Sequence, residues 1–573
     1  MKNLIVIIMV ICFSYYTGIN MDLFAQSSDK LTYDSKWDKD MKWGLIREIK
    51  VDKDQTRFDV QNLDILKDGL YFMVFIPNNP TSVNTRYLGR INGDSDPAHY
   101  CTSYLEVESG RRRQAGYYDI EPYPGQRDEG SYSSYLGRAD AASSSLTTFS
   151  LLLDGTNHAR WKTWSTSGNS DNVIVSSRGT HHRQTVKNVT LFSIISNVND
   201  AIGAGSKLLI YGKYKSEKPQ PSIQEFTITE DCTELVIAGL DAIRDNAYCM
   251  YFMPNNNTNS EVQYNLYVND DYVDDNYSSV WYGVHNTQGP EESGALFIDG
   301  AKRSPMVALA DANSSLTSHT WIVMDPQGHI RYWSEEASGK YSNVRAYGGY
   351  HDKEITNLNK LTIRSSVKNG LAAGSRVIIF GGGTDPYPVK SKIVKSRQLE
   401  YRWYKDIRID EDITELDIRN LDLKAAGFLN MDLIPNNRTL PEDAGGPGHY
   451  WSYVNGDMDN LNYCDAHFDV QEGVLCAIGG HLEPYYGWAY PQTSSHQPAL
   501  FMRDAQGHVR SRGYGTCHVQ GNLEIGKQSI CGRAFHHTRY VDNMTNLKII
   551  TDAKGGIGKG TRIIIFGGGA PLD

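Results

Sequence analysis

The sequence predicts an all-β protein, with three tandem antiparallel β-sandwich domains of jelly-roll-like character after a signal peptide. Three observations lead to this prediction. The chain repeats itself three times with identical spacings. The repeated segments alternate apolar and polar residues with a period of two, as half-buried strands do. Turn-forming residues separate the apolar runs, and no helical periodicity extends beyond two turns.

The first 25 residues have the features of a secretory signal peptide. Lys2 supplies a positive charge, an apolar run extends from Leu4 to about Tyr16, and Ala25 is a small residue suited to cleavage. The alternative is an anchor helix, but this run is shorter than the roughly 20 residues that a span needs. We therefore expect an exported chain with no membrane span after cleavage, in which residues 26–44 form a linker.

Three segments align without gaps and define the repeats. Leu63, Leu240 and Leu421 each lie 14 residues before Pro77, Pro254 and Pro435. We expect repeat 1 to cover 45–216, repeat 2 to cover 223–383 and repeat 3 to cover 393–573. Polar segments that contain proline separate the repeats, as domain junctions usually do.

The stretch "RVIIFGGG" at 376–383 returns as "RIIIFGGG" at 562–569. A dinucleotide-binding loop would need a helix after the glycines, but "TDPYP" follows the first copy. We interpret the stretch as the closing strand of a copied sandwich. Its continuous apolar run, like "YFMVFI" at 71–76, is typical of a strand that is buried on both faces or lies at the core of a sandwich.

These motifs resemble a β-sandwich domain of bacteriophage virion and tail-associated proteins. The resemblance rests on the Pro-Asn-Asn segments, the "NGD" turns, and a glycine with serine or threonine before the closing strand, and it covers nearly all of the chain after residue 45. It implies host-surface or glycan attachment, or a structural role in a virion, with no fixed catalytic set. The signal peptide departs from that family, and "FAQ" at the cleavage site looks like an exported protein of a Bacteroidetes-type bacterium.

Two sets of recurrent histidines are candidate ligand-binding residues. Each repeat has an Asp-x-x-x-His-x-Arg motif, and each has a further histidine 23 residues before a turn glycine. The candidates are His158, Arg160, His182, His329, Arg331, His351, His508, Arg510 and His537. Arginine could bind a sugar carboxylate with two hydrogen bonds if it shared an exposed face with the histidine.

Three interpretations of these residues remain open: maintenance of the fold, ligand contact, and catalysis or metal binding. Residues shared by duplicated domains usually maintain the fold, and a binding protein gains more from repetition than an enzyme does. No acidic residue is evident at ligand spacing beside the histidines, so no metal and no cofactor are expected.

Segments rich in tyrosine differ between the repeats and form a third group of candidates. Exposed aromatic rings on variable loops could stack on sugar rings, or they could pack on their own domain. The candidates are Tyr117, Tyr118, Tyr123, Tyr485, Tyr486, Trp488 and Tyr490.

The preferred hypothesis is an exported, non-enzymatic, three-module adhesion or receptor-binding protein, whose partner is a cell-surface or polysaccharide glycan. A structural, self-assembling surface or virion component, and thus a homo-oligomer, is the alternative. A polysaccharide-active enzyme that uses the recurrent His and Arg residues is the second alternative. The net charge of −10 with no long basic run argues against nucleic-acid binding.

Overall fold

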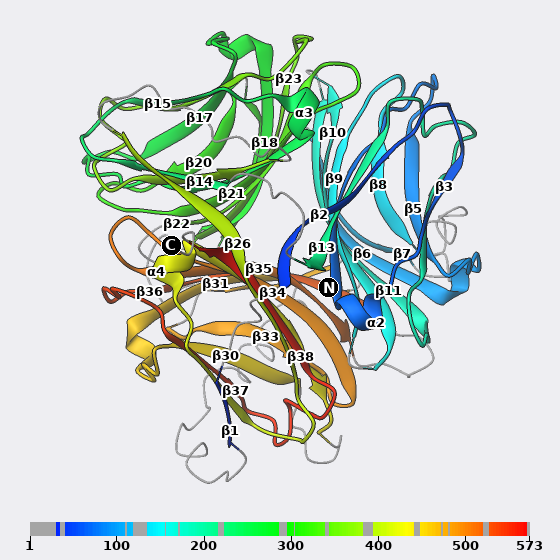
Figure 1. Ribbon diagram of the computed structural model, residues 1–573, viewed down its shortest axis with the longest axis vertical. Helices are drawn as coiled ribbons and strands as arrows, with labels where there is room; N and C mark the ends of the chain where they lie inside the picture. The colour runs from blue at the N-terminus through cyan, green and yellow to red at the C-terminus, as the bar shows by residue number, and fades with distance from the viewer. Residues whose placement is uncertain are drawn as a thin grey trace, which may run out of the picture.

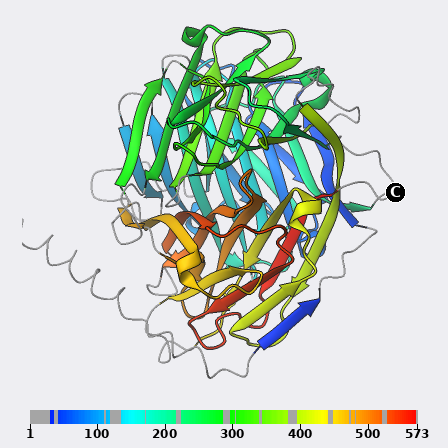
Figure 2. The same cartoon turned by 90° about the vertical axis from the view of Figure 1, so that its left-hand side faces the viewer.

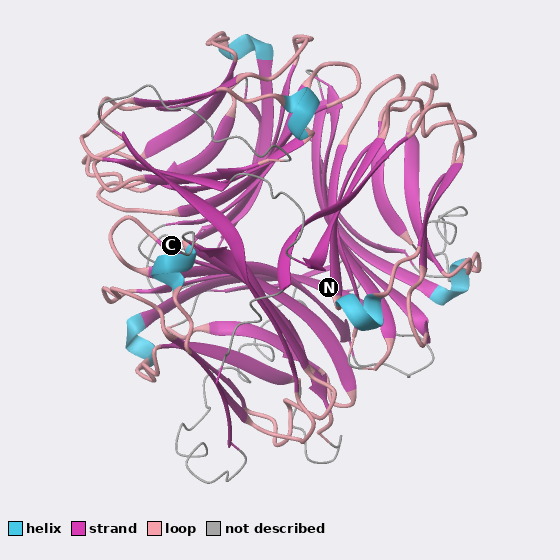
Figure 3. Ribbon diagram, viewed as in Figure 1, coloured by secondary structure: helices cyan, strands magenta, loops and turns pink. Residues whose placement is uncertain are grey.

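The computed structural model describes residues 30–34, 41–108, 112–118, 134–154, 156–169, 172–215, 223–285, 295–302, 304–338, 343–381, 394–439, 447–471, 474–479, 482–519 and 527–569. The protein is nearly all β and forms three sandwiches, so the predicted fold class is confirmed (Figures 1 and 3). The predicted signal peptide lies outside the described residues. Within them, no helix is both long enough and apolar enough to cross a membrane.

Repeat 1 pairs an eight-stranded sheet with a four-stranded sheet, in the orders β2-β13-β4-β9-β10-β11-β6-β7 and β3-β12-β5-β8. Its strands are β2 (Met41–Lys50), β3 (Arg57–Gln61), β4 (Leu70–Ile76), β5 (Thr85–Ile91), β6 (Tyr100–Glu108), β7 (Arg112–Tyr118), β8 (Tyr135–Ala139), β9 (Leu146–Leu153), β10 (His158–Asn169), β11 (Asn172–Thr185), β12 (Leu191–Ser196) and β13 (Lys207–Lys215).

Repeat 2 also has a large and a small sheet, and its large sheet continues into repeat 3. Its strands are β14 (Ile223–Ile228), β15 (Glu234–Ala238), β16 (Ala247–Met253), β17 (Val262–Val268), β18 (Tyr277–His285), β19 (Ala295–Lys302), β20 (Met306–Ala310), β21 (Thr317–Met324), β22 (Ile330–Ser338), β23 (Asn343–His351), β24 (Lys360–Ser365) and β25 (Arg376–Phe380). The four-stranded sheet has the order β15-β24-β17-β20, which matches that of repeat 1 strand for strand.

Repeat 3 contains β26 (Val394–Arg408), β27 (Glu415–Arg419), β28 (Phe428–Ile434), β29 (Asn436–Asn437), β30 (Gly448–Val454), β31 (Tyr463–Gln471), β32 (Val474–Gly479), β33 (Tyr485–Ala489), β34 (Thr493–Arg503), β35 (Val509–Val519), β36 (Lys527–His537), β37 (Asn546–Thr551) and β38 (Arg562–Gly569). One-turn helices recur at equivalent places: α2 (Ile65–Asp68), α3 (Ala242–Asp245) and α4 (Leu423–Ala426), and the 3-10 turns η2 (Pro97–His99), η4 (Asp274–Asn276) and η6 (Asn460–Asn462).

From the sequence we expected three sandwiches in a row. In the structure they are instead arranged around a common centre. The eight-stranded sheet of repeat 1 and the 17-stranded sheet that repeats 2 and 3 share face that centre, and the small sheets lie outside (Figures 1 and 2). Each sandwich has its own core, and a fourth core takes residues from all three repeats. The Trp164 and Trp333 rings lie 5.3 Å apart across the boundary between repeats 1 and 2. The Tyr251 and Phe428 rings lie 4.2 Å apart between repeats 2 and 3.

The closing strands show why the apolar runs are continuous. In β25, Val377 and Ile379 point into the core of repeat 2, whereas Ile378 and Phe380 point into the shared central core. Successive side chains alternate across a strand, so a strand between two cores needs apolar residues at every position. Burial on both faces is confirmed, and the second face contacts the neighbouring repeats.

Strand β26 connects two repeats, and strand β1 connects the N-terminal segment to repeat 3. The first half of β26 pairs with β14 of repeat 2, and its second half pairs with β38 of repeat 3, so the two large sheets are continuous. Near the N-terminus, β1 (Lys30–Asp34) pairs in parallel with β27 at the edge of the outer sheet of repeat 3. The chain ends of the described protein are thus tied to repeat 3.

Candidate functional site: the histidine-pinned turns

The Asp-x-x-x-His-x-Arg motif forms a tight turn whose aspartate and arginine are buried. In all three repeats, the arginine Nε donates to one oxygen of the aspartate, at 2.6, 2.9 and 2.8 Å. The other oxygen accepts from the backbone N–H of the histidine, at 2.9, 3.0 and 2.9 Å. Arg160, Arg331 and Arg510 are at most 2% exposed. The expectation of an exposed His-Arg face is therefore wrong for the arginines, which serve the fold.

The same motif also joins neighbouring repeats. The Arg331 guanidinium donates to the Gly168 carbonyl of repeat 1 at 2.9 Å, and Arg160 donates to the Ser494 carbonyl of repeat 3 at 3.0 Å. The Gln327 side chain donates to the Ala142 carbonyl of repeat 1 at 2.8 Å. The motif of one repeat thus donates hydrogen bonds to backbone carbonyls of another repeat. This contact is a structural reason for the recurrence of the motif.

Burial raises the pKa of the Asp154 and Asp504 carboxyls, but the charges of Arg160 and Arg510 outweigh it. Both pKa values therefore lie below the usual range. His158, His329 and His508 are half-buried beside these turns. Each ring lies 5.0 Å from the ring that the next strand presents, which is His181, Tyr350 or His536.

The second histidine set holds a different turn, which we call the histidine-pinned turn: residues 94–99, 271–276 and 457–462. His182, His351 and His537 are buried, and the Nε2 of each lies 2.9, 3.1 and 3.0 Å from a carboxylate oxygen of Asp94, Asp271 and Asp457, respectively. A tyrosine ring packs 4.8 Å from each histidine ring, and its hydroxyl donates to the backbone carbonyl of the same aspartate. These tyrosines are Tyr100, Tyr277 and Tyr463.

The backbone entering each turn is equally constrained. Asn92, Asn269 and Asn455 have φ values of 49°, 48° and 51°, a conformation that asparagine tolerates better than most residues. Each asparagine side chain bridges to the strand beside it. The histidine, tyrosine and asparagine therefore fix one turn geometry three times.

The three histidine-pinned turns share one backbone geometry, but their exposed side chains differ. Tyr272 and Val273 in repeat 2 are 39% and 53% exposed, and Met458 and Leu461 in repeat 3 are 38% and 71% exposed. Repeat 1 presents Ser95 and Asp96 instead. A constant frame with variable exposed side chains is a suitable arrangement for ligand binding.

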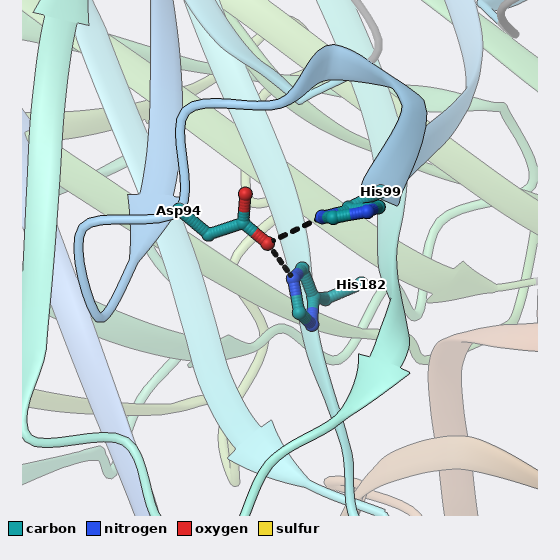
Figure 4. A group of neighbouring side chains, drawn as sticks. All are labelled: Asp94, His99 and His182. Atoms are coloured by element: carbon teal, nitrogen blue, oxygen red, sulfur yellow. Dashed lines mark hydrogen bonds and ion pairs between the residues drawn. The ribbon is translucent and has the colours of Figure 1, made fainter.

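In repeat 1 alone, the turn itself contains a histidine, His99, in addition to the pinning His182 from β11. Figure 4 shows Asp94 between His99 and His182; the Nδ1 of His99 lies 2.7 Å from the same oxygen that faces His182. In repeats 2 and 3 the position of His99 is occupied by Asn276 and Asn462.

The tyrosine-rich segments give a different result. Tyr485, Tyr486 and Trp488 form β33 and are 7%, 6% and 3% exposed, inside the core of repeat 3. Tyr490 is half-buried and packs against that core. The expectation that these rings lie on an exposed loop is wrong, because β33 completes the outer sheet beside β30. Tyr117 and Tyr118 lie in β7, and Tyr123 lies outside the described residues.

Sequence comparison of the repeats missed the pinned aspartates and His99. The signal was present, because "DSDPAHY", "DYVDDNY" and "DMDNLNY" align without gaps. It was overlooked because the aspartate and the histidine that contacts it are 80 or more residues apart in each repeat.

The centre of the molecule holds a cavity of about 90 Å³, which is lined by all three repeats. Phe72, Trp321 and Glu335 contribute to its wall. Burial raises the pKa of Glu335 to about 8, and burial lowers that of the nearby Lys162 to about 7. Both groups are thus driven toward their neutral forms, as expected for ionisable side chains buried away from solvent.

Comparison with known proteins assigns no family. No family model matches the chain, and no curated protein matches it. Solved structures with a weak likeness include domains LG4-5 of the mouse laminin alpha1 chain, at 10% identity over 63% of this chain and 98% of that one, with a TM-score of 0.13. Another is the Caenorhabditis elegans galectin LEC-6, at 11% identity over 27% of this chain and 91% of that one, with a TM-score of 0.10. Likenesses this low carry no argument about function.

Proposed function

We propose that this is an exported, non-enzymatic binding protein that attaches to cell-surface or polysaccharide glycans, built from modules like those of phage virion proteins. The observation that carries the proposal is the set of histidine-pinned turns. One rigid frame appears three times and presents a different group of exposed side chains each time. Fixed frames lower the entropy lost on binding, and variable side chains provide specificity.

The exposed side chains suit a sugar ligand. In repeat 2, the Tyr272 ring offers an apolar face, and Asp274 and Asp275 are exposed acceptors for sugar hydroxyls. The burial of the recurrent arginines in structural ion pairs favours binding over the catalytic alternative, because those guanidinium groups have no path to an external substrate.

A glycan array probed with the chain from residue 26 onward tests the proposal. We expect binding that is lost in the double variants Tyr272→Ala/Val273→Ser or Met458→Ser/Leu461→Ser. The matched control is Leu66→Ser/Ile243→Ser, which removes exposed apolar side chains from α2 and α3 and leaves the turns intact. Retained binding in both turn variants, or no binding to any glycan by the parent chain, would contradict the proposal.

Self-assembly is a second candidate, favoured by the pairing of β1 with β27. Within the described residues, the equivalent edges β3 and β15 of repeats 1 and 2 carry no added strand. Open edges accept strands from other chains, so β1 of a second copy could add there. Light scattering on the chain from residue 26, with and without residues 26–34, tests this candidate: a single-chain mass at high concentration would exclude it.

A further inference from the structure

We propose that Asp94, His99 and His182 of repeat 1 bind a divalent transition-metal ion, with Zn²⁺ as the best match. The three candidate ligand atoms lie within 4.8 Å of one another. Two imidazole nitrogens and one carboxylate favour zinc and its neighbours over Mg²⁺ or Ca²⁺, which prefer oxygen ligands.

The hydrogen bonds of His182 suit a metal ligand. Its Nδ1 lies 2.8 Å from the Gln184 carbonyl, which can only accept, so this nitrogen carries a proton. In the tautomer with the proton on Nδ1, the lone pair is on Nε2, and that atom faces a carboxylate oxygen at 2.9 Å. Two acceptors in contact repel each other, and a metal ion bound to both removes the repulsion. Metal-binding histidines commonly donate their other N–H to a carbonyl in this way.

Repeats 2 and 3 satisfy the same carboxylate with N–H donors instead. The Asn276 amide donates to both oxygens of Asp271 at 2.9 and 2.8 Å, and the Asn462 amide donates to both oxygens of Asp457 at 3.1 and 2.8 Å. The Nδ1 atoms of His351 and His537 have no hydrogen bond within the described structure. Their Nε2 can therefore carry the proton and donate to the aspartate, and no cation is needed.

Charge shows the same difference between the repeats. The residue two positions after the pinning histidine is Lys353 in repeat 2, whose Nζ lies 3.7 Å from Asp271. It is Arg539 in repeat 3, whose guanidinium donates to Asn462 at 2.7 Å and lies 3.9 Å from Asp459. Repeat 1 has the neutral Gln184 there. Repeat 1 does have the buried Arg90, whose guanidinium lies 4.5 Å from the centre of the Tyr100 ring and interacts electrostatically with Asp94. Arg90 forms no ion pair with Asp94 in the described structure, so the place beside the carboxylate that Lys353 takes in repeat 2 is left for the ion.

The two other His/Asp groups of the described structure are poorer sites. Asp154 and Asp504 are already ion-paired with buried arginines. A second positive ion beside Arg160 or Arg510 would be repelled at short range.

The site needs only a small opening to hold the ion. Ligand atoms bound to zinc at 2.0–2.2 Å in a tetrahedral arrangement lie about 3.3 Å from one another. Here the Asp94 oxygen lies 2.7 Å from His99 Nδ1 and 2.9 Å from His182 Nε2. His99 is partly exposed at the end of η2 and can move outward. Three protein ligands leave a position for water or for an oxygen atom of a bound partner.

Equilibrium dialysis of the chelator-treated chain from residue 26, without a histidine tag, tests the proposal with Zn²⁺ as the probe. We expect one Zn²⁺ per chain. His99→Asn, which installs the residue of repeats 2 and 3, should weaken binding by about 100-fold or more and leave the metal-free melting temperature and circular dichroism spectrum unchanged. His508→Asn is the matched control, and its zinc binding should match that of the parent chain.

A tetrahedral Co²⁺ absorption spectrum in the parent chain, absent in His99→Asn, would place the bound ion in this turn. If the parent chain binds no Zn²⁺, the proposal is wrong. Equal Zn²⁺ binding in His99→Asn, or its loss in His508→Asn, would also overturn it. None of these outcomes depends on glycan binding, so the two proposals fail separately.

Discussion

Arg331 holds a buried carboxylate and a backbone carbonyl of another repeat at the same time. Its Nε donates to Asp325 and its Nη1 donates to the Gly168 carbonyl. The ring of Tyr350 lies under its guanidinium at 4.6 Å. A side chain with five donors in a rigid plane suits this position, and lysine could not replace its geometry.

The first prediction concerns this ion pair. Arg331→Met should destabilise the protein by about 3–5 kcal/mol, because it leaves Asp325 charged, buried and unpaired. Urea unfolding measures the change. Arg57→Met is the control, since Arg57 pairs with Asp59 at 2.8 Å on the surface and its side chain is 44% exposed. The control should cost less than about 1 kcal/mol, and equal losses in the two variants would contradict the argument.

The second prediction concerns pH. The pKa of Asp504 is lower in the folded protein than in the unfolded chain, where it is about 3.9. Its stabilising contribution is therefore complete above that value and is lost as the pH falls toward the folded-state pKa. We expect the difference in unfolding free energy between the parent chain and Asp504→Asn to narrow from about pH 5 to pH 3. A difference that stays constant over this range would exclude the ion pair as its source.

At the scale of elements, the strands of the large sheets have two apolar faces that belong to different cores. In β4, Met73 and Phe75 point into the core of repeat 1, whereas Val74 and Ile76 point into the shared core. The periodicity of the sequence predicted each strand and its burial. It could not identify the partner of the second face, because apolar side chains carry no information about which surface covers them.

The third prediction concerns the contact between β23 of repeat 2 and repeat 1. A Cβ added at Gly348 would overlap the Val175 side chain and lie 2.8 Å from Thr166 Oγ1. Gly348→Ala should therefore destabilise the protein by about 1–3 kcal/mol through overpacking. Val175→Ala in the same chain should recover part of that loss, because it removes the overlapping methyl groups. A Gly348→Ala chain as stable as the parent would show that the repeats separate freely.

At the scale of the whole molecule, the three repeats form one body with a shared core. Isolated repeat 2 would expose Trp321, Trp333, Tyr251 and Phe380, which the other repeats cover. Such a large apolar face is unstable in water. The continuous sheet through β26 and the carbonyl contacts of the arginines add to the coupling.

The fourth prediction follows from this shared core. Calorimetry should show one cooperative unfolding transition for the whole chain, because no repeat can lose its inner face without exposing the core of the others. Repeat 2 expressed alone, residues 223–381, should bind a hydrophobic dye and aggregate. Three separate transitions, or a soluble and well-folded repeat 2, would mean that the domains are independent.

The sequence by itself determined the number of repeats and their β character, and it limited the closing strands to burial on both faces or a place at a sandwich core. Spacing and periodicity are local properties of the chain, so they could be read without the fold. Only the tertiary structure decided that Arg160, Arg331 and Arg510 are buried, that β33 is core, and that the three sandwiches share a centre. It also brought His182 to Asp94, 88 residues away. These contacts depend on which surfaces meet, and repeated motifs do not encode that choice in their own residues.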